Sequence, residues 1–296
     1  MDDDIAIEVS GLRMDYGATE VIRGIDLRIR RGEIVALLGP NGAGKTTTVE
    51  ILEGFREPTA GTVRVLGTDP LAAGEDWRAQ VGVVLQSWRD HGRWRVADLL
   101  ELMRRAYLPY GRDVYGVDDL LRDVGLSGQA RSRVRTLSGG QRRRLDVAIG
   151  IVGRPALLFL DEPTAGLDPV ARREFRELVH GLVDAAETTV LLTTHDLAEA
   201  ERMADRILIL DGGRIVADGS PDALARDIAS TTEVRWRQDG ERRVHATADA
   251  TSFVRDLLAH HPHGIDDLEI VRASLEDAYL AMVRRRESLE TEGVTR

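Results

Sequence analysis

Short runs of consecutive apolar residues recur along the chain, each only a few residues long. Such runs are typical of strands that are buried on both faces, as in a parallel sheet. Longer stretches with helical apolar spacing lie between them, and this alternation predicts an α/β layered fold. The predicted buried strands are Ile34–Leu38, Leu157–Leu160, Val190–Leu192 and Ile207–Leu210. The predicted helices are Thr47–Glu53, Arg142–Val152, Pro169–Ala185 and Leu197–Ala204.

The beginning of the chain has a different pattern. Apolar and polar residues alternate over Ile5–Val9, Val21–Ile29 and Thr62–Val65, which predicts an antiparallel flank to the sheet. Residues from about 95 to 135 are mainly helical in character, as in Val96–Tyr107 and Val117–Val124, and lie within a segment of about residues 88–145. We therefore expect a helical subdomain between strand-rich parts of one large domain.

A break at Ser220-Pro221 separates the last part of the chain from the rest. Beyond it we expect a small α+β domain, so that the two domains span residues 1–220 and 221–296. Its predicted elements are a helix at Asp222–Ile228, strands at Glu233–Arg237 and Glu241–Thr247, and helices at Ser252–Ala259 and from Ser274 onward.

Composition narrows the classes of function. Among 296 residues, 50 acidic and 40 basic side chains give a net charge of −10, which argues against nucleic acid as a partner. The absence of cysteine excludes disulfides and thiol chemistry. The acidic start and the lack of about 18 consecutive apolar residues predict neither a signal peptide nor a membrane span. Of the basic residues, only Lys45 is a lysine; the others are arginines.

A glycine-rich segment supplies the first candidate site. It has the Walker A spacing and runs through Gly39, Pro40, Asn41, Gly42, Ala43, Gly44, Lys45, Thr46 and Thr47. It follows an apolar strand and precedes a helix, a context in which backbone N–H groups surround phosphate oxygens. The pattern predicts that Lys45 binds the β- and γ-phosphates and that the Thr46 hydroxyl binds Mg²⁺. An ordinary glycine-rich turn is the alternative.

Two carboxylates follow the apolar run Leu157–Leu160. Asp161, at the carboxyl end of a buried strand, suits a ligand of Mg²⁺. Glu162 is then placed to orient or deprotonate an attacking water molecule. A solvated acidic turn is the alternative, and the presence of a Walker A segment in the same chain disfavours it.

Further motifs give the chain a resemblance to a known family. The residues before the Asp161 strand match the signature of ABC-type ATPases; they are Leu137, Ser138, Gly139, Gly140 and Gln141. Gln86 is similar to the Q-loop of that family, Asp168 to the D-loop, His195 to the switch histidine and Tyr16 to the adenine-stacking aromatic. The resemblance covers about residues 5 to 220 and implies a P-loop NTPase core of the RecA-like type.

The resemblance implies a catalytic cycle with ATP and Mg²⁺. Tyr16 would stack on adenine, Gln86 would contact Mg²⁺ or the lytic water, and His195 would bind the γ-phosphate and Glu162. For Tyr16 alone, a core or edge tyrosine is the alternative. The signature residues would close on ATP bound to a second copy of the chain. ATP would then join two copies head to tail, and hydrolysis would release them.

The last part of the chain resembles one subclass of ABC-type ATPases. Ser274–Met282 is similar to the ending of daunorubicin-resistance-like exporter ATPases, and it also fits an amphipathic helix. That resemblance implies a peripheral subunit at the cytoplasmic face of the membrane, which powers export through a separate permease. In the basic and aromatic segment after Gln86, we expect Trp88 and Trp94 to contact the permease, with a solvated loop as the alternative. Nothing in the sequence identifies the cargo.

Two further alternatives remain open. A soluble ABC ATPase that acts on ribosomes or DNA is the competing function, although such members usually carry a second ATPase domain or a long coiled-coil insertion.

The three arginines after the signature, Arg142, Arg143 and Arg144, fit a solvated and salt-bridged helix face better than a lipid contact.

Overall fold

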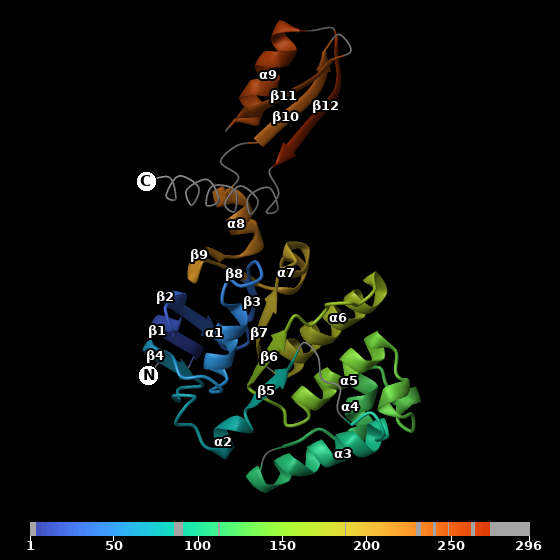
Figure 1. Cartoon of the computed structure of the whole chain (residues 1–296). Coiled ribbons are helices and arrows are strands. Elements are labelled where there is room, and N and C mark those ends of the chain that lie inside the picture. The colour runs from blue at the N-terminus through green and yellow to red at the C-terminus, as the bar shows by residue number, and fades with distance from the viewer. Residues whose placement is uncertain are drawn as a thin grey trace. The chain divides into compact units, whose positions relative to one another are not determined.

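The structure is a computed structural model of the chain. It describes residues 4–85, 91–111, 113–186, 188–228, 232–238, 241–247, 249–261 and 264–272. The chain divides into two compact units, Met1–Asp218 and Gly219–Arg296 (Figure 1).

A six-stranded sheet forms the centre of the first unit. In spatial order its strands are β5 (Val81–Val84), β6 (Leu157–Asp161), β7 (Thr189–Thr194), β3 (Ile34–Leu38), β8 (Arg206–Asp211) and β9 (Arg214–Gly219). The pairs from β5 to β8 are parallel, and every residue of β3 and β7 is buried. Burial on both faces explains why these strands are continuous apolar runs. The predicted α/β layered fold is confirmed.

The carboxyl ends of three neighbouring strands meet at one edge of this sheet. Leu38 at the end of β3 is paired with Thr194 of β7, and Asp161 at the end of β6 is paired with Thr193. The loops that follow β3, β6 and β7 therefore begin side by side. This edge is where open α/β sheets bind their ligands.

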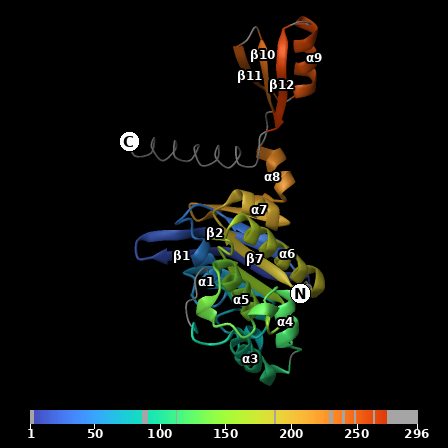
Figure 2. The ribbon, with the colours of Figure 1, turned by 90° about the vertical axis from the view of Figure 1, so that its right-hand side faces the viewer.

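Helices α1 (Lys45–Leu52), α6 (Pro169–Ala186) and α7 (Leu197–Met203) accompany the core strands. The sequence predicts all three, with ends that differ by one or two residues. Between β5 and β6 the chain forms α3 (Val96–Tyr107), α4 (Val117–Asp123) and α5 (Gly139–Ile151), joined by 3₁₀ turns at Leu108–Tyr110, Ser127–Gln129 and Val134–Thr136. In both views α3 and α4 lie together, away from the antiparallel sheet (Figures 1 and 2).

The antiparallel sheet has the strand order β2-β1-β4, which confirms the predicted flank. Its strands are β1 (Ile5–Tyr16), β2 (Thr19–Arg30) and β4 (Ala60–Val65), and a short helix α2 (Glu75–Arg78) follows. Strand β1 extends well beyond the predicted Ile5–Val9. Its register shifts between Val9 and Leu12, where Gly11 has φ +58°, so the simple alternation on which the prediction rested is lost.

The second unit contains α8 (Pro221–Ile228), β10 (Thr232–Gln238), β11 (Glu241–Thr247), α9 (Ala250–His260) and β12 (Ile265–Arg272). The strands form an antiparallel sheet with the order β11-β10-β12. Buried Trp236 lies 5.7 Å from the ring of Phe253 on α9, and this contact joins helix and sheet. The sequence did not predict β12, and the expected helix from Ser274 lies outside the described residues.

Among the residues that the structure describes, no helix is both long enough and apolar enough to cross a membrane.

Candidate active site

The glycine-rich loop runs from the end of β3 to the start of α1. Gly42 and Gly44 have φ values of +81° and +105°, a left-handed region in which residues with a side chain are strained. A Cβ atom on Gly39 would lie 2.3 Å from the carbonyl oxygen of Leu210, so only glycine fits there. These constraints explain the spacing of the glycines. The backbone that they permit leads the loop into the first turn of α1.

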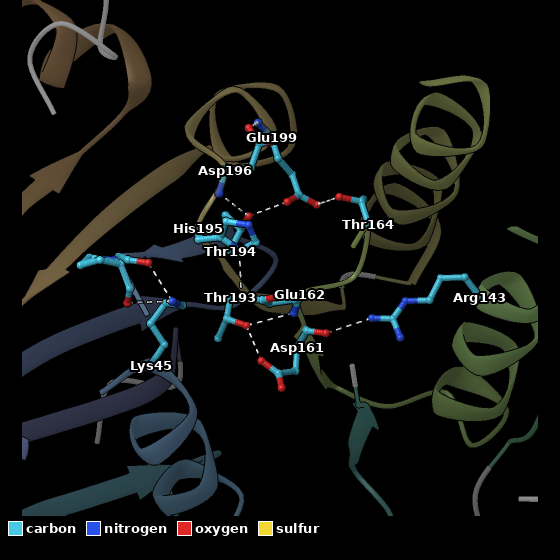
Figure 3. A network of polar contacts seen from close by, with 12 residues as sticks. Lys45, Arg143, Asp161, Glu162, Thr164, Thr193, Thr194, His195, Asp196 and Glu199 are labelled. Atoms are coloured by element: carbon cyan, nitrogen blue, oxygen red, sulfur yellow. Dashed lines mark hydrogen bonds and ion pairs between the residues drawn. The ribbon is translucent and has the colours of Figure 1, made fainter. Parts of the chain in front are cut away.

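Lys45 begins α1 and points back into this loop (Figure 3). Its Nζ atom donates to the carbonyl oxygens of Gly39 at 2.7 Å and Pro40 at 3.1 Å, and the residue is only 7% exposed. Burial lowers the pKa of the Lys45 ammonium, while the nearby carboxylates of Glu162 and Asp161 act in the opposite direction. The loop thus holds a cation whose position is fixed by two carbonyl groups.

The two carboxylates at the end of β6 are held by the neighbouring strand β7. The Thr193 hydroxyl donates to Oδ1 of Asp161 at 2.6 Å and accepts a bond from the backbone N–H of Glu162 at 3.0 Å (Figure 3). Glu162 has φ +41°, which for a residue with a side chain costs about 1–3 kcal/mol. The strand and the hydroxyl therefore stabilise a turn that this residue would not adopt alone.

His195 lies beside Glu162. Its Nδ1 atom is 3.0 Å from Oε1 of Glu162, and the histidine side chain is 56% exposed against 16% for the glutamate. The histidine follows the end of β7 and the glutamate follows the end of β6, so the sheet register brings the pair together. A carboxylate beside an imidazole can hold a water molecule in a defined orientation.

A carboxylate that the sequence did not single out links the same loops. Glu199 on α7 accepts hydrogen bonds from the Thr194 hydroxyl, at 2.5 Å, and from the Thr164 hydroxyl (Figure 3). Burial raises the pKa of Glu199, and the two hydroxyl groups oppose that effect. Glu199 thus connects the loop that carries His195 to the turn that follows Glu162. Its position three residues after Asp196, whose side chain caps α7, was the available signal.

Lys45, Asp161, Glu162 and His195 open onto one cavity of about 460 Å³. Ten of the predicted site residues line it: Tyr16, Asn41, Gly42, Gly44, Lys45, Thr46, Thr47, Asp161, Glu162 and His195. Tyr16 is 42% exposed at the end of β1, so it is not a core tyrosine, although the alternative of an edge tyrosine stays open. The predicted Gln86 lies outside the described residues.

The signature residues are not among those that line this cavity. Ser138 precedes α5, where its Oγ atom accepts a hydrogen bond from the N–H of Gln141 at 3.3 Å. The Ser138 N–H in turn donates to Oε1 of Gln141 at 3.0 Å. This capping box leaves the Ser138 hydroxyl proton available to another acceptor. The D-loop residue Asp168 caps α6, because its Oδ1 atom accepts from the N–H groups of Val170 and Ala171.

The solvated arginine face predicted for Arg142, Arg143 and Arg144 is wrong for Arg143. This residue is 7% exposed, and its guanidinium donates to three backbone carbonyl groups. Arg142 pairs with Asp146 of the same helix, and Arg144 pairs with Glu174 of α6. The sequence could not show this difference because the three carbonyl groups belong to distant strands and loops.

Comparisons with known proteins agree with this arrangement. A family model described as ABC transporter matches residues 22–165. The daunorubicin/doxorubicin resistance ATP-binding protein DrrA of Streptomyces peucetius is 41% identical over 243 residues, covering 81% of this chain and 73% of that protein. The chain belongs to the ABC transporter family. It is an ATP-binding, ATP-hydrolysing subunit of that family.

Other members of the ABC transporter family are similarly related. A Nod factor export ATP-binding protein I of Ralstonia nicotianae is 41% identical over 219 residues, which cover 74% of this chain and 68% of that protein. The solved structure of an ATP-binding subunit of an ABC transporter shares 31% identity and superposes with a TM-score of 0.65, covering 75% of this chain and 92% of the other.

The cavity fits magnesium bound together with a nucleotide better than a resident metal. Magnesium is usually held by one or two protein oxygens, with phosphates and water completing the shell. Thr46 and Asp161 line the cavity and provide a hydroxyl and a carboxylate. In the described part of this ABC subunit, no three His, Cys, Asp or Glu side chains gather as a metal cluster.

Glu53, directly after α1, gives a first prediction. Burial raises the pKa of its carboxyl group from 4.5 to about 8, and the charges of Asp161 and Glu50 add to the effect. An acid with a raised pKa in the folded state stabilises the fold at low pH. That contribution is lost as the pH rises from 4.5 through 8. Without Mg²⁺, Glu53→Gln should therefore be more stable than the wild type at pH 8.5 and similar to it at pH 4.5.

Urea unfolding at both pH values measures this difference. Glu57→Gln, at an exposed neighbouring position, is the matched control and should leave the pH dependence unchanged. Equal pH dependence of Glu53→Gln and the wild type would show that the Glu53 carboxyl is not held in its neutral form.

Proposed function

We propose that the chain is the peripheral ATPase of an exporter, bound at the cytoplasmic face of the membrane to a separate permease. Two copies close head to tail around ATP, hydrolyse it and separate, and this movement drives the permease. The observation that carries the proposal is the division of the site. Tyr16, Lys45, Glu162 and His195 share one cavity, whereas Ser138 does not line it and is exposed at a helix start.

Within one copy, each side chain has a part that follows from its position. Backbone N–H groups between Gly39 and Thr47 bind the phosphates, and the Lys45 ammonium neutralises charge on the β- and γ-phosphates. Thr46 and Asp161 would hold Mg²⁺, which would add positive charge beside the phosphates when bound. Tyr16 stacks on adenine; the Cζ atom of Arg56 lies 5.1 Å from its ring centroid.

Hydrolysis itself falls to Glu162 and His195. The Glu162 carboxylate accepts a proton from the attacking water molecule. The water oxygen bonds to the γ-phosphorus while the bond between that phosphorus and the leaving oxygen of ADP breaks. His195, 3.0 Å from Glu162, fixes the carboxylate and contacts the γ-phosphate. Gln86, which lies outside the described residues, would contact Mg²⁺ or the water, as the resemblance to the Q-loop implies.

The second copy completes the site. The hydroxyl of its Ser138 and the N–H groups of its Gly139 and Gly140 contact the γ-phosphate at the start of α5, where the helix dipole favours an anion. Leu137 and Gln141 shape and cap that helix start, and Asp168 lies in the loop before α6. A single copy therefore has only half of each hydrolytic site.

Export is the direction that the relatives support, because proteins named for drug resistance and for Nod factor export are equally similar to this chain. Their different cargoes imply that the permease, not the ATPase, selects the molecule. Nucleic acid is not among the proposed partners, since the chain carries a net charge of −10.

Fractionation of the native cells that produce the chain tests the proposal. We expect the chain in the membrane fraction, with ATPase activity that depends on Mg²⁺. Recovery with ribosomes or DNA, and none in the membrane fraction, would contradict the proposal and favour the alternative.

The permease contact carries a prediction of its own. Trp94 is 42% exposed, packs near the ring of His91 at 6.1 Å and follows the proposed contact residue Trp88, which lies outside the described residues. Aromatic side chains at such contacts often contribute about 2 kcal/mol or more each. Trp88→Ala combined with Trp94→Ala should reduce co-purification with the permease about tenfold or more, without a change in ATP affinity.

Val216→Ala is the control, because Val216 is 46% exposed on β9, at the opposite edge of the core sheet from β5. Undiminished co-purification of the double tryptophan variant would remove this segment from the proposed contact.

A further inference from the structure

Arg143 lies inside the first unit, one turn into the helix that the signature begins. Its guanidinium donates three hydrogen bonds to backbone carbonyl oxygens: Nε to Pro163 at 2.6 Å, Nη1 to Leu85 at 2.6 Å and Nη2 to Asp161 at 3.0 Å. The residue is only 7% exposed. Figure 3 shows the side chain reaching from α5 toward the end of β6.

Two of these carbonyl groups flank the proposed catalytic base. Asp161 precedes Glu162 and Pro163 follows it, so one guanidinium holds the backbone on both sides of this residue. Glu162 itself has the left-handed φ of +41°. The strained turn is thus fastened from one side by Thr193 of β7 and from the other by Arg143 of α5.

The third carbonyl group extends the connection to β5. Leu85 is the residue directly before Gln86. A single side chain therefore joins the residue before the Q-loop, the turn that carries Glu162 and the signature helix. A planar guanidinium with a fixed fork can donate in several directions at once, which an ammonium on a flexible stem does not reproduce.

The electrostatics of the residue fit a positioning role. Burial lowers the pKa of the Arg143 guanidinium, and the charges of Asp146, Asp161 and Glu199 oppose that effect. The three carbonyl groups that accept its hydrogen bonds orient the cation without neutralising its charge. Keeping an arginine in such surroundings requires that all these acceptors stay in place.

Arg143 is also rigidly connected to the surface that would meet a second copy. Ser138 caps α5, and Arg143 lies five residues further on, about 7.5 Å along the helix axis. A displacement of the helix start is therefore transmitted to the guanidinium and from there to the carbonyl groups beside Glu162.

We propose that Arg143 is a positioning residue that clamps the Glu162 turn to the signature helix of the same copy. Contact of Ser138 with the partner's nucleotide would then set the position of Glu162 in this copy's own site. This inference rests on the proposed function, because it assumes that Glu162 is the base and that the signature acts on the second copy.

A double-mutant cycle tests the clamp. We expect Arg143→Met to lower kcat about 30-fold with little change in KM or in ATP affinity, because Lys45 and the glycine-rich loop remain intact. In a Glu162→Gln background, the same substitution should change the residual single-turnover rate less than about threefold, because the group it positions is already gone.

Arg142→Met is the matched control, since Arg142 is the preceding arginine and pairs with Asp146 of its own helix. It should change kcat by the same small factor in both backgrounds. Arg143→Lys, which retains the charge and part of the hydrogen bonding, should give an intermediate kcat and serves if Arg143→Met fails to fold.

The outcomes separate the two proposals. Equal losses from Arg143→Met in both backgrounds, or a wild-type kcat in Arg143→Lys, would overturn the clamp and leave the proposed function standing. Wild-type turnover by Glu162→Gln alone would overturn the proposed function, whatever the Arg143 variants show.

Discussion

Glu162→Gln should lower the rate of ATP hydrolysis about 10²–10⁴-fold, the range expected when a general base is removed. An amide cannot accept the proton of the attacking water, yet it has nearly the same shape as the carboxylate. Contacts to His195 can persist because an amide oxygen or nitrogen can still hydrogen-bond to the imidazole. Binding of ATP should persist as well, since Lys45 and the glycine-rich loop are unchanged.

With binding intact and hydrolysis slow, the two copies should remain closed. We therefore expect Glu162→Gln to elute as a dimer with ATP and as a monomer with ADP, with light scattering as the measure of mass. Glu177→Gln is the control, because the Glu177 side chain is 68% exposed on α6 and pairs with Arg173 of the same helix. Turnover of Glu162→Gln at the wild-type rate would remove Glu162 from the role of base.

Lys45→Arg should lose most of the ATPase activity, about 10²–10³-fold, although the charge is retained. The Lys45 ammonium is 7% exposed and donates to the carbonyl oxygens of Gly39 and Pro40 at 2.7 and 3.1 Å. A compact ammonium fits between these carbonyl groups and the phosphates, whereas a guanidinium is wider, planar and forked. Steady-state hydrolysis and a nucleotide-binding titration measure the effect.

The reverse exchange at the surface is the control. Arg105→Lys, at a side chain that is 70% exposed on α3, should leave the rate within about twofold of the wild type, because an exposed ion pair contributes little. An active Lys45→Arg variant would show that the shape of the cation in the loop is not important. It would count against the assignment of the phosphate site.

The sequence predicted best those parts whose structure depends on neighbours along the chain. Ile34–Leu38 is recognisable as a buried parallel strand because both of its faces are apolar, and Gly42 and Gly44 after it are dictated by their positive φ angles. Strand β12 was missed because, among its residues whose burial is described, all except Ile265 are exposed, with Ile270 at 52%. Its pattern therefore lacks the contrast between a buried and an exposed face.

The parts that could not be predicted depend on distant segments. Arg143 has two arginine neighbours in the sequence, and nothing local distinguishes it from them. It is buried because the carbonyl groups of Leu85, Asp161 and Pro163 converge where α5 passes. Glu199 is similar, since its hydroxyl partner Thr164 is 35 residues away. Pairing of this kind becomes visible only when the strand order is known.

The chain's single lysine also makes the nucleotide loop chemically addressable. A protease that cuts only after lysine has one peptide bond to attack in the whole protein, between Lys45 and Thr46. That bond lies in the first turn of α1, at the wall of the cavity, and the lysine before it is buried. Cutting the chain into two fragments, or acylating its one side-chain amine, therefore reports on the opening of this loop alone. Because every other basic position apart from histidine is an arginine, mass spectrometry of the cleaved or acylated chain can follow nucleotide binding at this loop without an added label.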